Sequence, residues 1–226
     1  MSHPLRVSLH ASSRAKSYSR MYFDMCAKAL VRYRVYAEKL RQLHELDLDY
    51  DKTFEQVEEA SVEPVIFAGM CLESTLYDLS VCLFGDEFVA NTDKLDPVGK
   101  FFNLAMLVDR HVPNTSSVTY QSIQSLVTVR NKLVHHKSQA MQDDNLLKLM
   151  ARAEKEHNKH LQGITSSFRA LVLLSLYFDG NIFEELRIIP SFKKPEYWCS
   201  IIPQDLHGDV EWCINTSREE RARANE

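Results

Sequence analysis

The most informative stretch of this chain is Ile123–His135, with the sequence IQSLVTVRNKLVH. Its apolar residues recur at the period of an α-helix and form one stripe: Ile123, Leu126, Val127, Leu133 and Val134. Arg130 lies on that stripe, seven residues after Ile123 and four before Val134. Because an unpaired buried charge is very costly, we expect Arg130 to be paired, to face an interface or to line a cleft.

The charges around this stretch are unevenly distributed. From Arg110 to Gln142 the chain has no Asp or Glu, although its formal net charge is −4. The same segment holds Arg130, Lys132 and Lys137. Such a segment predicts a locally positive surface that suits a phosphate-bearing ligand. A solvated basic face of a helix explains the charges equally well.

The composition is typical of a soluble globular protein, with 226 residues of which 45% are hydrophobic and 26% are charged. This length fits one domain, or one domain with an extension. The apolar runs are too short to cross a bilayer, and the N-terminus has no apolar core of signal-peptide length. We therefore expect a cytoplasmic protein without a membrane segment.

The sequence does not indicate a metal or cofactor site. Its five cysteines include no CxxC pair, which favours free structural thiols over disulfides or a zinc site. His157 and His160 are one helical turn apart, but the charged residues around them favour a solvated face over metal binding. We expect neither a metal nor a cofactor.

The chain is expected to be all-α, because six glycines, seven prolines and the lack of period-2 alternation disfavour strands. Apolar periodicity and capping residues predict helices over about residues 17–45, 64–83, 97–108, 118–136 and 145–177. Thr53 and Gln56 have the spacing of a capping box and could start a further segment. Pro64 suits the first turn of one helix, and Asp96-Pro97 supplies an N-cap and a proline at N1 for another. Residues 85–94 are expected to form a loop.

Three parts are predicted along the chain. Residues 1–50 form a basic segment and a long helix that packs on the bundle, residues 51–180 form the helical bundle, and residues 181–226 form an irregular extension. The extension contains Trp198 and Trp212, whose rings favour packing against the helices. Its last residues, from Arg218, are charged and are expected to be disordered.

Arg130, Asn131 and His135 form the sequence R-N-x-x-x-H near the end of a major helix. This pattern resembles the HEPN superfamily (higher eukaryotes and prokaryotes nucleotide-binding), whose signature is an arginine followed by a histidine at this spacing. His136 satisfies the next permitted spacing. The resemblance covers roughly residues 64–180, and it implies a HEPN-like antiparallel helical bundle.

The resemblance also implies a function. Many members of this superfamily are metal-independent endoribonucleases in which two protomers bring their motifs together. They serve as toxins, in defence against phage or in RNA processing. For this chain the resemblance implies an RNA endonuclease that forms a homodimer with a composite active site, with RNA and, for a toxin, an antitoxin protein as partners.

The chemistry of the motif residues suits this reaction. A histidine exchanges protons near neutral pH, so His135 could take a proton from a ribose 2′-hydroxyl or donate one to the departing 5′-oxygen. Arg130 could clamp the scissile phosphate with its fork-shaped guanidinium, and Asn131 could orient either group. Three further basic residues are expected to hold the RNA backbone: Lys132, Lys137 and Arg110.

Glu73 is the predicted partner of Arg130. It lies on a helical stripe with Ile66, Met70 and Tyr77, so we expect it to point inward. Family members often carry an acidic or polar residue there that contacts the motif arginine. A purely structural ion pair is an equal alternative.

Two other functions stay open. The chain could be a non-catalytic HEPN-like module for dimerisation or for binding a nucleotide or RNA, with Arg130 and Glu73 holding the fold together. It could also be a helical protein whose partner docks on the extension that contains Trp198 and Trp212. We favour the RNA endonuclease.

Overall fold

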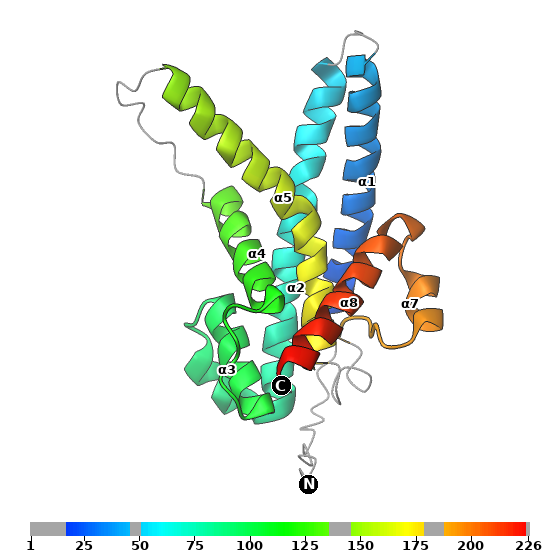
Figure 1. Cartoon of the computed structure of the whole chain (residues 1–226). Coiled ribbons are helices and arrows are strands. Elements are labelled where there is room, and N and C mark those ends of the chain that lie inside the picture. Colours follow the sequence, from blue (N-terminus) through cyan, green and yellow to red (C-terminus); the bar gives the residue numbers. More distant parts are fainter. Residues whose placement is uncertain (1–16, 46–50, 136–145, 179–187, 225–226) are drawn as a thin grey trace.

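The structure, a computed structural model, describes residues 17–45, 51–135, 146–178 and 188–224 (Figure 1). In this part of the chain every regular element is a helix, so the predicted all-α class is confirmed. The elements in chain order are α1 (Ser19–Glu45), α2 (Asp51–Thr92), α3 (Pro97–Asp109), α4 (Val118–Val134), α5 (Leu146–Phe178), α7 (Pro195–Ile201), η1 (Gln204–Leu206) and α8 (His207–Ala224).

The helices share one core. α1 and the first half of α2 form a long antiparallel arm, α5 packs against both α2 and α4, and α8 crosses α5 (Figure 1). All three predicted parts of the chain contribute to this core, whose largest fully buried side chains are Phe23, Leu30, Leu72, Leu76, Leu79, Phe101, Leu104, Ile123, Leu126, Phe168 and Phe192. The predicted boundaries near residues 50 and 180 adjoin undescribed segments and stay predictions.

α2 joins two segments that the sequence had separated at Pro64. It starts at Asp51, and Pro64, expected in the first turn of a helix, lies in its interior. A proline inside a helix removes one backbone hydrogen bond. The helix continues across Pro64 because one face stays buried on both sides of it, at Ser61 and at Val65. Tertiary packing of this face therefore outweighs the local preference.

The expected loop over residues 85–94 is reduced to a single break at Gly85. This residue has φ 82° and ψ 176°, and the helix resumes after it and ends at Thr92. Such a backbone conformation is essentially restricted to glycine. A Cβ atom at Gly85 would meet nothing within 4 Å, so the cost of a substitution here lies in the backbone alone.

We expect Gly85→Ala to lower the free energy of unfolding by about 1–3 kcal/mol, because alanine must adopt this strained backbone. Gly208→Ala is the matched control, since Gly208 lies in the first turn of α8 with open space around it. There the added methyl group should be neutral or stabilise by up to about 1 kcal/mol. Urea denaturation followed by circular dichroism measures both variants. If Gly85→Ala were as stable as the parent, the assigned backbone conformation would be wrong.

The sequence had suggested an irregular C-terminal extension, but the described part of it is helical. α7, η1 and α8 occupy most of residues 195–224, and α8 includes Arg218, where disorder was expected to begin. The apolar periodicity is weak because α8 buries few apolar residues, among them Val210 and Cys213. Polar contacts hold its end instead: Glu220 accepts hydrogen bonds from the backbone nitrogen and Oγ1 of Thr119, at 3.2 and 2.7 Å.

The two tryptophans of this part lie in different surroundings. Trp198 is 3% exposed and contacts the ring of His207 edge-to-face, so it belongs to the core. Trp212 is 39% exposed, and the guanidinium carbon of Arg169 lies 4.5 Å from its ring centroid. The expected packing of Trp198 against the helices is confirmed. For the same reason its ring cannot serve as the docking surface of a partner in this structure.

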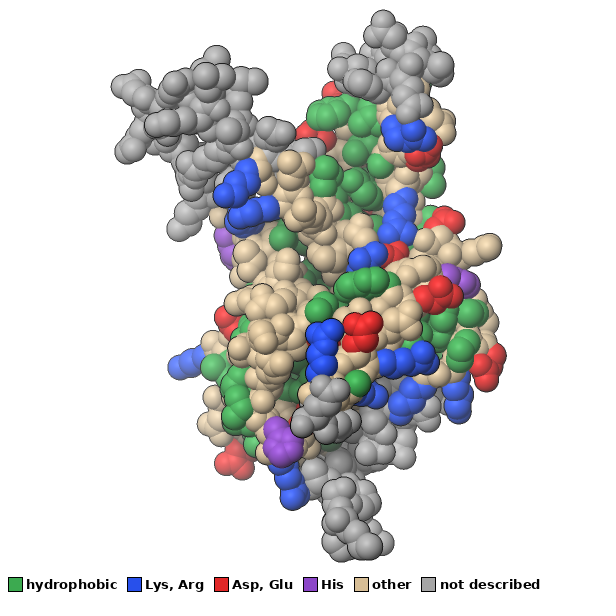
Figure 2. All heavy atoms as spheres, viewed as in Figure 1, with side chains coloured by type: hydrophobic (Ala, Val, Ile, Leu, Met, Phe, Trp, Pro, Cys, Tyr) green, Lys and Arg blue, Asp and Glu red, His purple; other side chains and the backbone are tan. Residues whose placement is uncertain are grey.

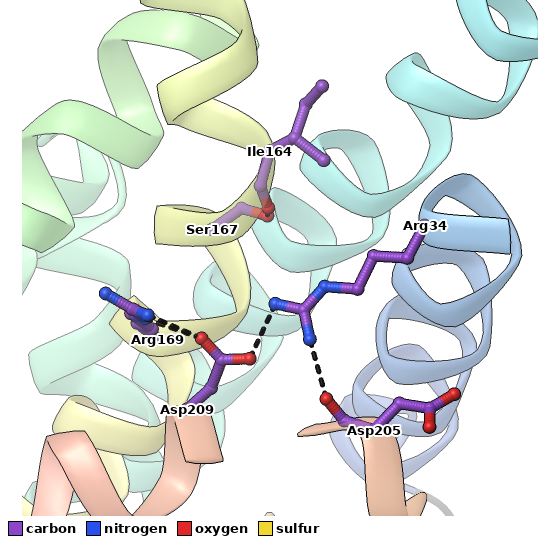
Figure 3. Close-up of polar contacts among 6 residues, drawn as sticks. All are labelled: Arg34, Ile164, Ser167, Arg169, Asp205 and Asp209. Atoms are coloured by element: carbon purple, nitrogen blue, oxygen red, sulfur yellow. Dashed lines mark hydrogen bonds and ion pairs between the residues drawn. The ribbon is translucent and has the colours of Figure 1, made fainter. Parts of the chain in front are cut away.

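A charged cluster fastens α8 to α1 and α5 (Figure 3). The carboxylate of Asp209, 4% exposed, accepts hydrogen bonds from Arg34 of α1 at 2.6 Å and from Arg169 of α5 at 2.7 Å. Nη1 of Arg34 also donates to the backbone carbonyl of Asp205 at 2.7 Å. One buried carboxylate thus holds two arginines whose side chains are about one-third exposed. Sequence reasoning missed this cluster.

Among the described residues, two stretches of helix are long and apolar enough to cross a membrane, by length and composition alone: Lys52–Thr92 and Asn158–Phe178. Their most apolar windows are 56% and 67% buried inside the bundle. Core helices of soluble proteins have the same properties, so these stretches indicate a membrane span only weakly. The expected absence of a membrane segment and the cytoplasmic location stay predictions.

Burial protects three of the five cysteine thiols. Cys26, Cys71 and Cys213 are buried and Cys199 is exposed, and all are free thiols, as expected. Burial raises the pKa of Cys71 from its ordinary value of 9.0 to about 12 and raises the pKa of Cys26 and of Cys213 as well. A raised thiol pKa favours the neutral form in the folded state. This contribution to stability is therefore complete below pH 9 and is lost as the pH rises toward 12.

We expect iodoacetamide at about pH 9 to alkylate Cys199 in the folded protein and to leave Cys26, Cys71 and Cys213 unmodified, because the thiolate is the reactive form. Unfolding in urea should expose all of them. The free energy of unfolding should fall by about 1–2 kcal/mol per buried thiol between about pH 8 and pH 10. Peptide mass spectrometry and urea titrations measure the two effects. Rapid alkylation of Cys71 in the folded protein would contradict its burial.

Candidate functional site

The helix that carries the motif is α4. Oγ of Ser117 accepts a hydrogen bond from the backbone nitrogen of Tyr120 at 3.1 Å and so caps the first turn. The helix ends at Val134, and the backbone nitrogen of His135 donates to the carbonyl of Asn131 at 2.9 Å. The expected helix is confirmed, and the motif histidine lies at its C-cap.

Two glycines let α4 approach its neighbours closely. A Cβ atom on Gly69 of α2 would lie 2.8 Å from Cγ of Arg130. A Cβ atom on Gly163 of α5 would lie 3.0 Å from both methyl groups of Val129. Glycine inside a helix costs about 1 kcal/mol relative to alanine, so these two positions are occupied by glycine for a packing reason. These two glycines are the feature of the sequence from which the contacts of α4 could have been predicted.

Arg130 and Glu73 form an ion pair, as predicted. Nη2 of Arg130 lies 3.2 Å from Oε1 of Glu73, and Nη1 donates to Oδ1 of Asn131 at 3.0 Å. The side chains of Arg130 and Glu73 are 24% and 44% exposed, so the expectation that Glu73 points inward is wrong. The pair lies at the solvent edge of the α2–α4 contact. Ion pairs with such exposure contribute little to stability.

His135 lies on a different side of α4 from Arg130. Five residues at 100° each rotate the direction by about 140° beyond one full turn. Arg130 lies over Gly69 of α2, whereas His135 is exposed at the end of the helix. The structure brings Arg130, Asn131 and Glu73 together but does not add the histidine of the same chain to them.

The predicted RNA-binding residues fall in separate places. Lys132 is exposed in the last turn of α4. Arg110 is also exposed, but it ends α3, where it adopts a left-handed conformation with φ 58°. Lys137 and His136 lie outside the described residues, so their predicted roles stay predictions. Of the described members of the basic set, Lys132 is on the helix that carries the motif and Arg110 is not.

A groove of about 480 Å³ runs between α4 and α5. Lys132 and Lys159 contribute its basic groups, and Val129 and Leu133 contribute apolar ones. Amides and hydroxyls complete the wall: Gln121, Gln124, Ser125, Thr128 and Gln162. Among the described residues that line the groove, none is Asp or Glu. Figure 2 shows blue basic side chains where α4 and α5 diverge, at the left of the view.

A second groove, of about 400 Å³, is lined by a larger share of apolar residues. It lies among α1, α2 and α5 and is lined mainly by apolar residues, with Glu58 as its acidic member. His160 lines both grooves, and its Nε2 lies 2.8 Å from Oγ of Ser61. Because Ser61 donates its one hydroxyl hydrogen to the carbonyl of Glu58 at 2.6 Å, His160 acts as the donor to Ser61. This serine is therefore a structural partner and not an activated nucleophile.

The structure does not bear out His160 as a metal ligand. Among the described residues, no group of three His, Cys, Asp or Glu side chains is arranged to hold a metal ion. The side chain of His157, the other member of the spacing noted above, lies outside the described residues. His160 instead joins α5 to α2 through Ser61. A reaction without a metal stays a prediction.

Comparison of the chain with protein families, with curated proteins and with solved structures gave no match. The likeness to the HEPN superfamily therefore depends on the motif residues Arg130, Asn131 and His135 alone.

Proposed function

We propose that this chain is a metal-independent endoribonuclease of the HEPN type that works as a homodimer. The observation that carries the proposal is the group at the end of α4. Glu73 and Asn131 hold Arg130 in place, and its guanidinium stays partly exposed. A guanidinium has five N–H donors, so these two contacts leave donors for a phosphate. His135 lies in solvent at the end of the same helix.

The proposed reaction needs only these groups. His135 takes the proton of a ribose 2′-hydroxyl, and the 2′-oxygen forms a bond to the adjacent phosphorus. The bond from phosphorus to the 5′-oxygen breaks, and a protonated imidazole gives its proton to that leaving oxygen. Arg130 binds the phosphate oxygens as charge develops on them, and Asn131 keeps the guanidinium oriented. The products are a 2′,3′-cyclic phosphate and a 5′-hydroxyl.

The geometry of α4 supports the proposed homodimer. Within one chain, Arg130 and His135 lie on sides of the helix about 140° apart, which does not suit a single phosphate. Two copies that meet at the ends of α4 could offer Arg130 of one protomer and His135 of the other to the same phosphate. In this proposal the helical fold is a HEPN-like bundle, and the protein acts in the cytoplasm as a toxin, in phage defence or in RNA processing.

One observation favours the alternative of a non-catalytic module. The ion pair between Arg130 and Glu73 joins α4 to α2 over Gly69, which is a structural role that needs no substrate. In that alternative the positive surface of α4 binds RNA or a nucleotide without cutting it. Stability separates the two functions, because a structural arginine affects unfolding more than a catalytic one does.

The test of the proposal is cleavage of RNA by the purified full-length chain in the presence of EDTA. We expect new fragments that carry 2′,3′-cyclic phosphate and 5′-hydroxyl ends, identified by mass spectrometry. The same sequence with 2′-O-methyl groups should stay intact because the nucleophile is blocked. If the protein leaves a varied set of RNAs intact, or cuts only when a divalent metal is added, the proposal fails.

A further inference from the structure

The groove between α4 and α5 is the strongest unassigned feature of the molecule. Val129, one of its lining residues, meets Gly163 of α5 at a distance that leaves no space for a side chain on the glycine. Beyond this contact the two helices diverge, and the first half of α5 extends away from α4 (Figure 1). The lining of the groove extends along α4 from Gln121 to Leu133 and along α5 from Lys159 to Gln162.

The groups in the groove indicate the chemistry of its occupant. Lys132 and Lys159 come from different helices, so they can contact successive phosphates of one strand. Three glutamines offer both donors and acceptors, which suit the edges of unpaired bases. The apolar side chains of Val129 and Leu133 can contact the faces of those bases. The described lining has no carboxylate that would repel an anion.

The dimensions and position of the groove further restrict the kinds of ligand that it can bind. A volume of about 480 Å³ lies in the range of roughly 300–1,000 Å³ typical of small-ligand sites, which suits a few unpaired nucleotides and not a duplex. Thr128 and Lys132 are four residues apart on one face of α4, and His135 follows after three more. The groove therefore leads along α4 toward the exposed motif histidine.

We propose that the groove between α4 and α5 binds single-stranded RNA through Lys132, Lys159 and the glutamine side chains, and guides the strand toward the end of α4. This inference rests on the proposed action on RNA. The neighbouring apolar groove does not serve this purpose, because its lining combines Phe54, Val57 and Val62 with the carboxylate of Glu58.

The test uses fluorescence anisotropy with the full chain and a labelled 2′-O-methyl RNA strand of about 12 nucleotides, a length in the range of single-strand binding sites. This probe cannot be cut by attack of a 2′-hydroxyl. We expect the double variant Lys132→Glu with Lys159→Glu to bind the strand at least about tenfold more weakly. The slope of log affinity against log salt should fall by about 1.4, because two phosphate contacts are lost.

The matched control is Lys28→Glu with Lys94→Glu, which makes the same change of charge at two exposed lysines outside the groove. It should bind within about twofold of the parent. A second variant, Ser125→Trp, fills the groove without a change of charge and should also lose about tenfold in affinity. Thermal melting followed by circular dichroism verifies that each variant is folded.

Several outcomes would overturn the groove assignment. They are no binding of the strand by the parent, equal affinity of the groove variants and the control, equal binding of a duplex, or displacement by a mononucleotide with the affinity of the strand. The proposed cleavage can fail while the groove assignment holds, and the reverse is also possible. A parent that binds RNA through the groove but never cuts it retains this inference and loses the enzymatic function. A parent that cuts RNA and whose groove variants bind like the control retains the function alone.

Discussion

Replacement of Asp209 by alanine is expected to lower the free energy of unfolding by about 3 kcal/mol, the largest effect on stability that we predict. The carboxylate is 4% exposed and is shared by Arg34 and Arg169, which lie on two different helices. Loss of one member of a buried ion pair costs about 3–5 kcal/mol, because the remaining charge stays without compensation. The lower end applies here, since both arginines are about one-third exposed and water can solvate them.

The measurement is urea denaturation, with thermal melting as a second readout. For a chain of this length a loss of 3 kcal/mol corresponds to a fall in Tm of about 6–12 °C. Glu219→Ala is the matched control on the same helix, because Glu219 pairs with Arg223 at 3.7 Å with both side chains well exposed. It should change stability by less than about 0.5 kcal/mol. If both variants lost the same small amount, the cluster would not hold α8 in place.

The contributions of the two arginines to this cluster can also be measured separately. Arg34→Ala and Arg169→Ala each leave Asp209 with one remaining partner, so each should cost less than the loss of the carboxylate. Because the three side chains form one network, the effects of the two arginine variants should not add. Additive effects in a double-mutant cycle would show that the two contacts act independently.

Replacement of either motif residue is expected to have the largest effect on activity. Arg130→Ala and His135→Ala should each lower the rate of RNA cleavage at least about 100-fold, because the first removes charge stabilisation and the second removes proton transfer. Arg130→Lys should restore little, since an ammonium lacks the two-pronged geometry of a guanidinium. His111→Ala, at an exposed histidine just after α3, is the matched control and should cut like the parent.

Stability measurements on the same variants distinguish catalysis from a structural role. The ion pair between Arg130 and Glu73 is partly exposed, so its loss should cost no more than about 1 kcal/mol. Glu73→Gln should show a similar small cost. A loss of several kcal/mol in Arg130→Ala, with no cleavage by the folded parent, would support the non-catalytic module instead.

Mixing the two inactive variants tests the composite site. In a heterodimer of Arg130→Ala and His135→Ala, one of the two shared sites would combine an intact arginine with an intact histidine. Up to one quarter of the sites should then be active after subunit exchange, although each variant alone is inactive. The absence of any rescue, in a mixture shown by native mass spectrometry to contain heterodimers, would place both residues of a site in one chain.

Local signals in the sequence predicted several elements correctly. The cap at Asp96 and the proline after it mark the start of α3, and Oδ1 of Asp96 accepts a hydrogen bond from Gly99 at 2.7 Å. The period of apolar residues predicted α4 and α5. The position of Arg130 on an apolar stripe required a partner, and Glu73 is that partner. Each of these signals acts within a few turns of one helix or concerns one side chain that must be compensated.

Local signals of this kind failed where packing between distant segments determines the structure. Pro64 looks like a helix boundary, yet α2 continues past it because its buried face is covered by other helices. Gly85 does interrupt the helix as expected, but a helical stretch and not a loop follows it to Thr92. α8 looks irregular because few of its residues are apolar, and its position depends on Asp209 and Glu220. Arg34 and Asp209 are 175 residues apart in the chain, so no local pattern joins them.

By itself the sequence determined that this protein is helical, that Arg130 needs a partner and that the end of α4 has basic and proton-transferring groups without nearby carboxylates in the chain. Only the tertiary structure decided where those groups lie. Helical rotation separates Arg130 from His135. The packing of α4 against α5, with Gly163 close to Val129, leaves a groove along the two helices. The physical reason is that periodicity and capping act along one helix, whereas ion pairs, grooves and close contacts arise between helices.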